Sequence, residues 1–163
     1  MEEKFIIDTD PGVDDTAAIF WLLSKHPDSV LAFTTVFGNV EVEQTSRNMG
    51  ALLTELGRGD VPLYQGCAGP LVGAPNFAKH VHGDSGVGGF VSEAEPRAVT
   101  SSKTAPVAIL DILREHPAGD VSLLALGPLT NLAVAYRLEP ETFRRARRII
   151  FMGGAVRTWG NAS

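Results

Sequence analysis

The sequence has few of the features that mark secreted, membrane-spanning or nucleic-acid-binding proteins. Its 163 residues include a single cysteine, Cys67, so no internal disulfide can form and a reducing compartment is favoured. No apolar run reaches the roughly 18 residues that a membrane-spanning helix needs, and the first residues lack the basic-then-apolar layout of a secretory signal. A net charge of −5 argues against a nucleic-acid partner, because phosphate binding requires a basic surface. These absences predict a cytoplasmic protein without a membrane partner.

Short apolar runs alternate along the chain with segments of helical periodicity. The chain is long enough for one domain with a sizeable core, and no repeat or linker divides it. Strands that alternate with helices and are continuously apolar are typical of an α/β fold, an open, mostly parallel sheet with helices on both faces. The expected strands are residues 5–8, 30–37, 61–64, 121–126 and 148–152, and the expected helices are residues 14–25, 43–56 and 106–116, with a further helix after Gly127-Pro128 that has Leu129 on its inner face.

A long stretch rich in glycine and proline, from Gln65 to about Pro96, interrupts this alternation. Loops of that length in a compact domain are usually functional or disordered, and the histidines in its middle favour a loop that covers a site. In parallel sheets, ligands bind outside the carboxyl ends of the strands. Polar or glycine-bearing segments follow three expected strands, at residues 8–15, 38–39 and 152–154, and we expect them to converge there.

Four aspartates lie within eight residues at the first expected strand-to-helix turn: Asp8, Asp10, Asp14 and Asp15. Two unit charges about 4 Å apart repel by roughly 4 kcal/mol at an effective dielectric constant near 20. A helix N-terminus offsets at most about 1 to 2 kcal/mol of this repulsion, whereas a bound divalent cation offsets far more. Oxygen ligands favour a hard cation such as calcium or magnesium over zinc, so the cluster predicts a cation site.

The acidic cluster has three other interpretations besides a cation site. Helix capping by Asp14, with Asp15 solvated, would explain only one or two of the four acids. An EF-hand loop would need a glutamate where Ile19 stands. A haloacid-dehalogenase-like phosphatase also places Asp-x-Asp after its first strand, but Gly-Thr or similar normally follows, not Pro11-Gly12. The phosphatase stays as the alternative enzyme, and a non-catalytic interaction or sugar-binding fragment as the alternative of another class.

Several segments, in order and spacing, resemble the inosine-uridine preferring nucleoside hydrolase family over essentially the whole chain. The first is Asp8-Thr9-Asp10-Pro11-Gly12-Val13-Asp14-Asp15, which resembles the family's N-terminal signature. The others are residues 35–39, 82–86, 126–133 and 152–155, with Gly160-Asn161 beyond. The resemblance implies a nucleoside N-ribohydrolase, which hydrolyses the N-glycosidic bond of purine or pyrimidine ribonucleosides to base and ribose.

The resemblance also implies a role for each matching site residue. Calcium would be held by Asp10, by both oxygens of Asp15 and by the backbone carbonyl of Leu126. Asp10 would take a proton from the attacking water, and Asp8 would orient the loop through hydrogen bonds. The small-molecule ribonucleoside would be contacted by Asp14, Asn39, His82, Met152 and Asn161.

In isolation, several of these residues have simpler interpretations. Asn39 and Gly153-Gly154 could be plain turn residues, and His82 a solvated loop residue; their joint occurrence at strand ends favours the functional interpretation. Family members run to about twice this length, so the resemblance implies that residues 1–163 are the N-terminal portion of one domain and are weakly active or inactive alone. Truncation would expose a strand edge, which invites dimerisation, so a homo-oligomer stays an open expectation.

Overall fold

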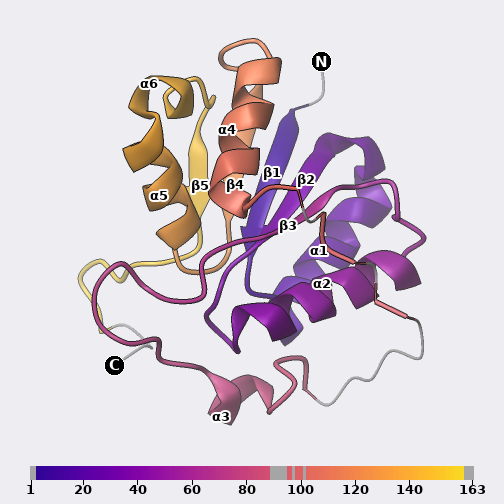
Figure 1. The fold of residues 1–163 in the computed structure, drawn as a ribbon. Helices are drawn as coiled ribbons and strands as arrows, with labels where there is room; N and C mark the ends of the chain where they lie inside the picture. The colour runs from indigo at the N-terminus through magenta and orange to yellow at the C-terminus, as the bar shows by residue number, and fades with distance from the viewer. Residues whose placement is uncertain (1–2, 89–94, 97, 101, 160–163) are drawn as a thin grey trace.

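The computed structural model describes residues 3–88, 95–96, 98–100 and 102–159. It contains a five-stranded, all-parallel sheet in the order β3-β2-β1-β4-β5 (Figure 1). The strands are β1 (Lys4–Thr9), β2 (Val30–Thr35), β3 (Leu63–Gln65), β4 (Val121–Ala125) and β5 (Ile149–Phe151). The helices are α1 (Val13–Lys25), α2 (Val42–Glu55), α3 (Lys79–His82), α4 (Ala105–Glu115), α5 (Thr130–Leu138) and α6 (Pro140–Phe143), and a 3-10 turn, η1, spans Pro27–Ser29.

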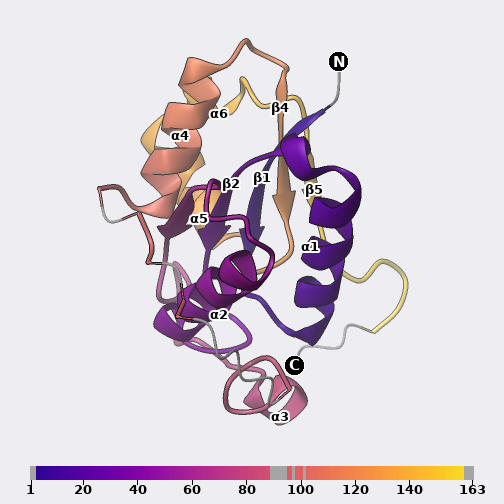
Figure 2. The same cartoon turned by 90° about the vertical axis from the view of Figure 1, so that its right-hand side faces the viewer.

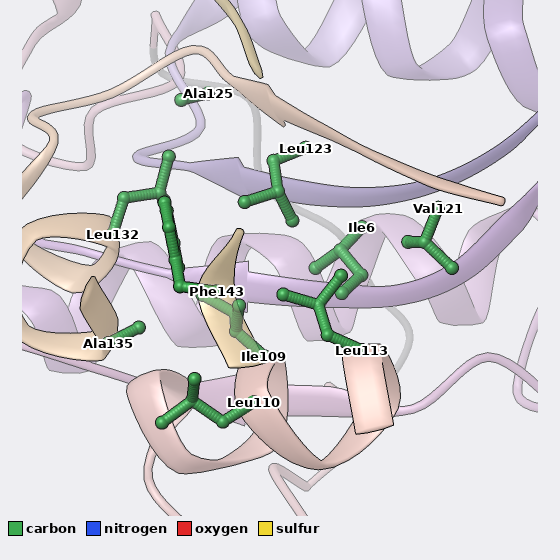
Figure 3. Packing of buried hydrophobic residues seen from close by; sticks show 10 residues of the cluster. All are labelled: Ile6, Ile109, Leu110, Leu113, Val121, Leu123, Ala125, Leu132, Ala135 and Phe143. Atoms are coloured by element: carbon green, nitrogen blue, oxygen red, sulfur yellow. The ribbon is translucent and has the colours of Figure 1, made fainter. Parts of the chain in front are cut away.

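Helices cover both faces of the sheet, which confirms the predicted fold class (Figure 2). Ile6 and Ile7 are neighbours on β1, so their side chains point to opposite faces. Ile6 packs with residues of α4, α5 and α6 in the cluster drawn in Figure 3, whereas Ile7 packs with residues of α1 and α2. Burial on both faces explains why these strands are apolar without alternation.

The order of the strands places a topological switch point beside β1. From β1 the chain runs outward through β2 to β3, and then it crosses back to β4 and β5 on the other side of β1. The crevice at such a point, outside the carboxyl ends of the strands, is where α/β sheets bind ligands. Here the Leu126 N–H donates a hydrogen bond of 2.8 Å to the carbonyl oxygen of Asp8 and joins the ends of β1 and β4.

Two short helices were not predicted from the sequence. α3 lies inside the long stretch that follows β3, and α6 follows α5 after Glu139, with Pro140 in its first turn. Each has four residues, about one turn, which is too short to give a periodic apolar pattern. Within the described residues, no helix combines the length and apolar character needed to cross a membrane.

Candidate functional site

A cleft of about 560 Å³ lies at the carboxyl end of the sheet. Its walls come from the turn after β1, from the segment that includes α3, and from the residues that follow β4 and β5. This volume falls in the range of small-molecule sites. Seven of the residues predicted from the sequence line it: Asp10, Asp14, Asp15, Asn39, His82, Leu126 and Met152. Asp8 lies buried at the end of β1, and Asn161 lies outside the described residues.

The Asp10 side chain is bonded by Asn39 and enclosed by the backbone that follows β2 and β4. The Asn39 N–H donates to Asp10 Oδ2 at 2.8 Å, and the Asn39 side-chain amide donates to the Asp10 carbonyl oxygen at 2.7 Å. Gly38 and Gly127 approach the carboxylate closely: a Cβ atom at Gly38 would overlap Oδ2, and one at Gly127 would lie 2.5 Å from Oδ1. The carboxylate is therefore fixed in a slot that admits only glycine on these two sides.

We predict that Gly127→Ala destabilises the chain by about 1 to 3 kcal/mol, because the added methyl group also meets Val36 at 2.9 Å and the buried neighbours must move. Urea denaturation measures the change. Gly59→Ala is the matched control, since nothing lies within 4 Å of its added Cβ. Equal midpoints for the two variants would contradict the close packing around Asp10.

Asp15 caps α1, and Asp14 does not. The N-cap residue of α1 is Gly12, which has no side chain to cap with, and its N–H donates to Asp15 Oδ2 at 2.9 Å. Asp15 is buried, whereas Asp14 is exposed toward the cleft. The alternative in which Asp14 caps the helix and Asp15 is solvated is therefore wrong, because the third residue of a helix can reach back to the N-cap N–H.

Burial governs the electrostatics of the carboxylates. Burial, together with the nearby charge of Asp15, raises the pKa of Asp10 to about 8. Burial likewise raises the pKa of Asp15, against the lowering effect of its bond from Gly12. In the described part of the chain, the ion pairs between lysine or arginine and acidic side chains do not include either carboxylate. Among the described residues, neither acid thus has a lysine or arginine partner that would favour its ionised form, although the nearby His82 lowers the pKa of Asp15.

This donor set fits part of the ligand shell of a hard cation. Two buried carboxylates lie in one cleft with the backbone of Leu126 and Gly127, and oxygen atoms are the ligands that calcium prefers. Calcium takes six to eight oxygen ligands, however, and the described residues contain no group of three or more acidic, histidine or cysteine side chains arranged to hold a metal. The residues present could therefore supply a portion of the coordination.

Asp8 lies at the centre of a buried hydrogen-bond network. Its Oδ1 accepts from the Thr34 hydroxyl at 2.5 Å and from Asn131 Nδ2 at 2.7 Å. Burial raises the pKa of Asp8 to about 7, and these two bonds oppose that rise. Asn131 Nδ2 also donates to the Thr35 carbonyl oxygen at 2.9 Å, and its Oδ1 accepts from the Cys67 N–H at 2.8 Å. Asn131 thereby ties the ends of β1 and β2 and the segment after β3 to α5.

Asn131 is the structural residue that sequence reasoning missed. The sequence shows it only as one letter of the 126–133 segment, and Leu129 was expected on the inner face of that helix. The structure reverses this: Asn131 is fully buried, whereas Leu129 is 43% exposed and lines the cleft. Helix α5 begins only at Thr130, so Leu129 lies before its first turn. A polar residue inside an otherwise apolar helical segment was the available signal.

The remaining predicted residues have looser contacts. The Val13 N–H lies 3.5 Å from His82 Nδ1, and the Asn39 side-chain amide lies 3.5 Å from Asp15 Oδ2. Met152 is 64% exposed, and its N–H continues the β4–β5 pairing by donating to the Ala125 carbonyl oxygen. These side chains are placed around an open space and are free to meet a ligand, but their roles stay predictions.

Comparison with known proteins identifies related sequences. Uridine nucleosidase 1 of Arabidopsis thaliana is 41% identical over 162 residues, which cover 99% of this chain and 48% of that protein. The inosine-uridine preferring nucleoside hydrolase of Leishmania major is 37% identical over 163 residues, which cover 100% of this chain and 52% of that protein. The chain therefore spans about half the length of the curated relatives it matches.

Solved structures agree with the sequence comparisons. A purine-preferring ribonucleoside hydrolase from Gardnerella vaginalis superposes with a TM-score of 0.89 at 32% identity, over 98% of this chain and 51% of that one. A plant nucleoside hydrolase superposes with a TM-score of 0.87 at 38% identity, over 95% of this chain and 49% of that one. The family model described as inosine-uridine preferring nucleoside hydrolase matches residues 5–163, which displaces the phosphatase alternative. This chain belongs to the inosine-uridine preferring nucleoside hydrolase family.

Proposed function

We propose that this chain supplies one part of the active site of a nucleoside N-ribohydrolase, which hydrolyses purine or pyrimidine ribonucleosides to base and ribose. The observation that carries the proposal is the position of Asp10. Its buried carboxylate lies at the switch point of the sheet, held by Asn39 and closely approached by Gly127, in a cleft that can hold a nucleoside. The proposed substrate is a small-molecule ribonucleoside.

Asp10 is the proposed general base. Calcium held by Asp10, Asp15 and the Leu126 carbonyl would supply the counter-charge that keeps both acids ionised and would orient a water for attack. The main-chain bond from Asn39 leaves Asp10 Oδ1 available to receive a proton from that water. A positioned base of this kind is usually worth about 10² to 10⁴ in rate.

The other cleft residues would bind and stabilise the sugar. Asp14 and Asn39 carry exposed or half-buried polar groups beside Asp10 and would bind ribose hydroxyls. Met152 and Asn161 would contact the sugar, and His82 would lie near the leaving base. Cleavage of the N-glycosidic bond develops positive charge on the sugar, as in glycoside hydrolysis, and the acidic cleft would stabilise that charge.

A chimera tests the proposed function. Residues 1–163 are joined to the half of the Leishmania major enzyme that lies outside its match to this chain, and hydrolysis of inosine and uridine is measured with and without calcium. We expect calcium-dependent hydrolysis that Asp10→Asn lowers by about 10² or more, and little or no turnover by the 163-residue chain alone.

Asp84→Asn is the matched control for the chimera, since Asp84 is an exposed residue outside the cleft lining. A folded chimera that binds calcium without hydrolysing either nucleoside would refute the proposal. If the 163-residue chain alone turned over nucleosides as fast as the chimera, the proposal that this chain supplies only part of the calcium ligands would be wrong. We also propose a cytoplasmic location, which the single cysteine supports.

A further inference from the structure

The loop between β4 and α5 forms one wall of the cleft but has no regular secondary structure of its own. It comprises residues 126–129, between the end of β4 and the start of α5, and is here called the β4–α5 loop. It lines the cleft and carries a proposed calcium ligand, the Leu126 carbonyl oxygen. A Cβ atom at Gly127 would lie 2.5 Å from Asp10 Oδ1, so the loop runs directly beside that carboxylate. Contacts with other segments must therefore set the distance between this loop and Asp10.

Both ends of the β4–α5 loop are bonded to the same residue, Asp8. At the first residue of the loop, the Leu126 N–H donates to the Asp8 carbonyl oxygen at 2.8 Å. Two residues past the end of the loop, Asn131 Nδ2 donates to Asp8 Oδ1 at 2.7 Å. Asp8 lies near the end of β1, two positions before Asp10. The loop is therefore fastened at both ends to the strand that leads into Asp10, and these bonds fix where it lies beside that carboxylate.

The Asn131 side chain is itself held from several directions. It is fully buried in the first turn of α5, and its amide also donates to the Thr35 carbonyl oxygen at 2.9 Å. Its Oδ1 accepts from the Cys67 N–H at 2.8 Å, and a Cβ atom at Gly66 would lie only 2.2 Å from that oxygen. Asn131 therefore cannot shift without breaking bonds to the ends of β1 and β2 and to the segment after β3.

Attachment of α5 to the sheet does not by itself require a buried amide. Leu132 and Ala135 of the same helix are buried in the apolar cluster that packs against β1 and β4. Burying an amide costs free energy unless its hydrogen bonds are made. What the bonds of Asn131 add to apolar packing is direction, because hydrogen bonds are confined to a narrow range of distance and angle. Groups that bind a metal ion need such precision, and partners behind the ligands supply it.

We propose that Asn131 is a positioning residue of this site: through Asp8 it holds the β4–α5 loop where the Leu126 carbonyl oxygen and Asp10 can bind one cation. The cation rests on the proposed function, whereas the hold on the loop does not. Asn131 is absent from the cleft lining, so it acts on binding only through the residues that it holds. Loss of a hydrogen-bonding partner behind a metal ligand typically lowers metal affinity about 10- to 100-fold.

Calcium titration calorimetry of the 163-residue chain measures the effect on binding. We expect Asn131→Ala to raise the dissociation constant for calcium about tenfold or more. Leu113→Ala is the matched control, because Leu113 is also buried and its truncation also destabilises the chain. Leu113 packs toward Val121, where β4 begins, whereas the cleft lies at the other end of that strand (Figure 3). Leu113→Ala should therefore leave the dissociation constant unchanged.

Amide hydrogen exchange without calcium measures the hold on the loop. The Leu126 N–H reports on the loop, and the Leu123 N–H, which donates to the Arg148 carbonyl oxygen at 3.0 Å, is the reference within β4. We expect Asn131→Ala to lower the protection of Leu126 relative to Leu123 by about tenfold, because the loop then opens locally. Leu113→Ala should not lower this ratio, since it weakens the chain as a whole.

Circular dichroism checks that each variant is folded. If Asn131→Ala does not fold, Gly66→Ala takes its place under the same criteria, because its added Cβ displaces the Asn131 amide from the other side. An unchanged exchange ratio overturns the inference, and so does equal calcium affinity of the variant and a wild type that binds the ion. A lowered exchange ratio in a chain whose wild type binds no calcium supports the hold on the loop and contradicts the calcium site of the proposed function.

Discussion

Replacing Asp10 with asparagine is expected to stabilise the metal-free chain at pH 8 while removing its binding of calcium. Asparagine keeps the shape of the side chain and can still accept the bond from the Asn39 N–H, but it carries no charge. The substitution therefore removes the cost of a buried carboxylate beside Asp15. Opposite effects on stability and on ligand binding are the pattern expected of a residue retained for function.

The sign of the pH dependence follows from the raised pKa. The pKa of Asp10 is about 8 in the folded chain, against the ordinary value of 3.8. Between these values the unfolded chain releases a proton that the folded chain keeps, so the free energy of unfolding falls as pH rises. The contribution of Asp10 to the free energy of unfolding is fully present below about pH 4. It is lost progressively as the pH rises to about 8. For Asp10 alone the full loss is about 6 kcal/mol.

Urea denaturation at pH 5 and pH 8 and calcium titration calorimetry measure these effects. Asp10→Asn should flatten the decline in stability between the two pH values and abolish the calcium signal. Asp84→Asn is the matched control, since Asp84 is exposed and lies outside the cleft lining, and it should change neither quantity appreciably. Identical calcium titrations of wild type and Asp10→Asn would count against the cation site.

Replacing Asn131 with alanine is expected to cost about 3 to 5 kcal/mol of stability. The change removes two donated bonds and one accepted bond in a fully buried position. The Thr35 carbonyl oxygen and the Cys67 N–H each lose the bond that they make with Asn131. Asp8 Oδ1 loses one of its two donors and keeps the Thr34 hydroxyl. Each buried polar group left without a partner costs about 1 to 3 kcal/mol.

Denaturation of wild type and Asn131→Ala measures this loss. Asn48→Ala is the matched control: Asn48 is a half-buried asparagine on α2 that donates to the Ser85 carbonyl oxygen and accepts from Gln44. Asn48→Ala should lower the free energy of unfolding by about 1 kcal/mol. If the two variants were equally stable, the network around Asp8 would not be the tie between strand ends that its geometry indicates.

The parts of the fold that sequence predicts well are those with a local cause. Ile6 and Ile7 lie in a run that is apolar on both sides, and this pattern is typical of a strand buried between two layers of helices. The helix after Pro11-Gly12 was predicted from the spacing of its apolar residues, and α1 spans Val13–Lys25. The four aspartates between the end of β1 and the first turn of α1 also predict a candidate site from sequence alone, because their mutual repulsion requires compensation.

The remaining features depend on contacts between residues far apart in the chain. The rotation of α5 is set by what it packs against, so only the folded chain decides that Asn131 is buried at the strand ends while Leu129 faces the cleft. The choice of Asp15 as the cap of α1 depends on the backbone around Gly12. The sheet order, which makes β5 an open edge and β1 the centre, arises from pairing between distant strands.

The sequence by itself thus determined the class of fold, the family and the acidic turn, because periodicity and residue type act over a few neighbouring positions. The tertiary structure decided which carboxylates are buried, how Asn131 ties the strand ends together and which edge of the sheet stays open. Those features follow from contacts between segments that are distant in the sequence, such as the bond from Asn131 to Asp8. Local sequence patterns do not predict such contacts.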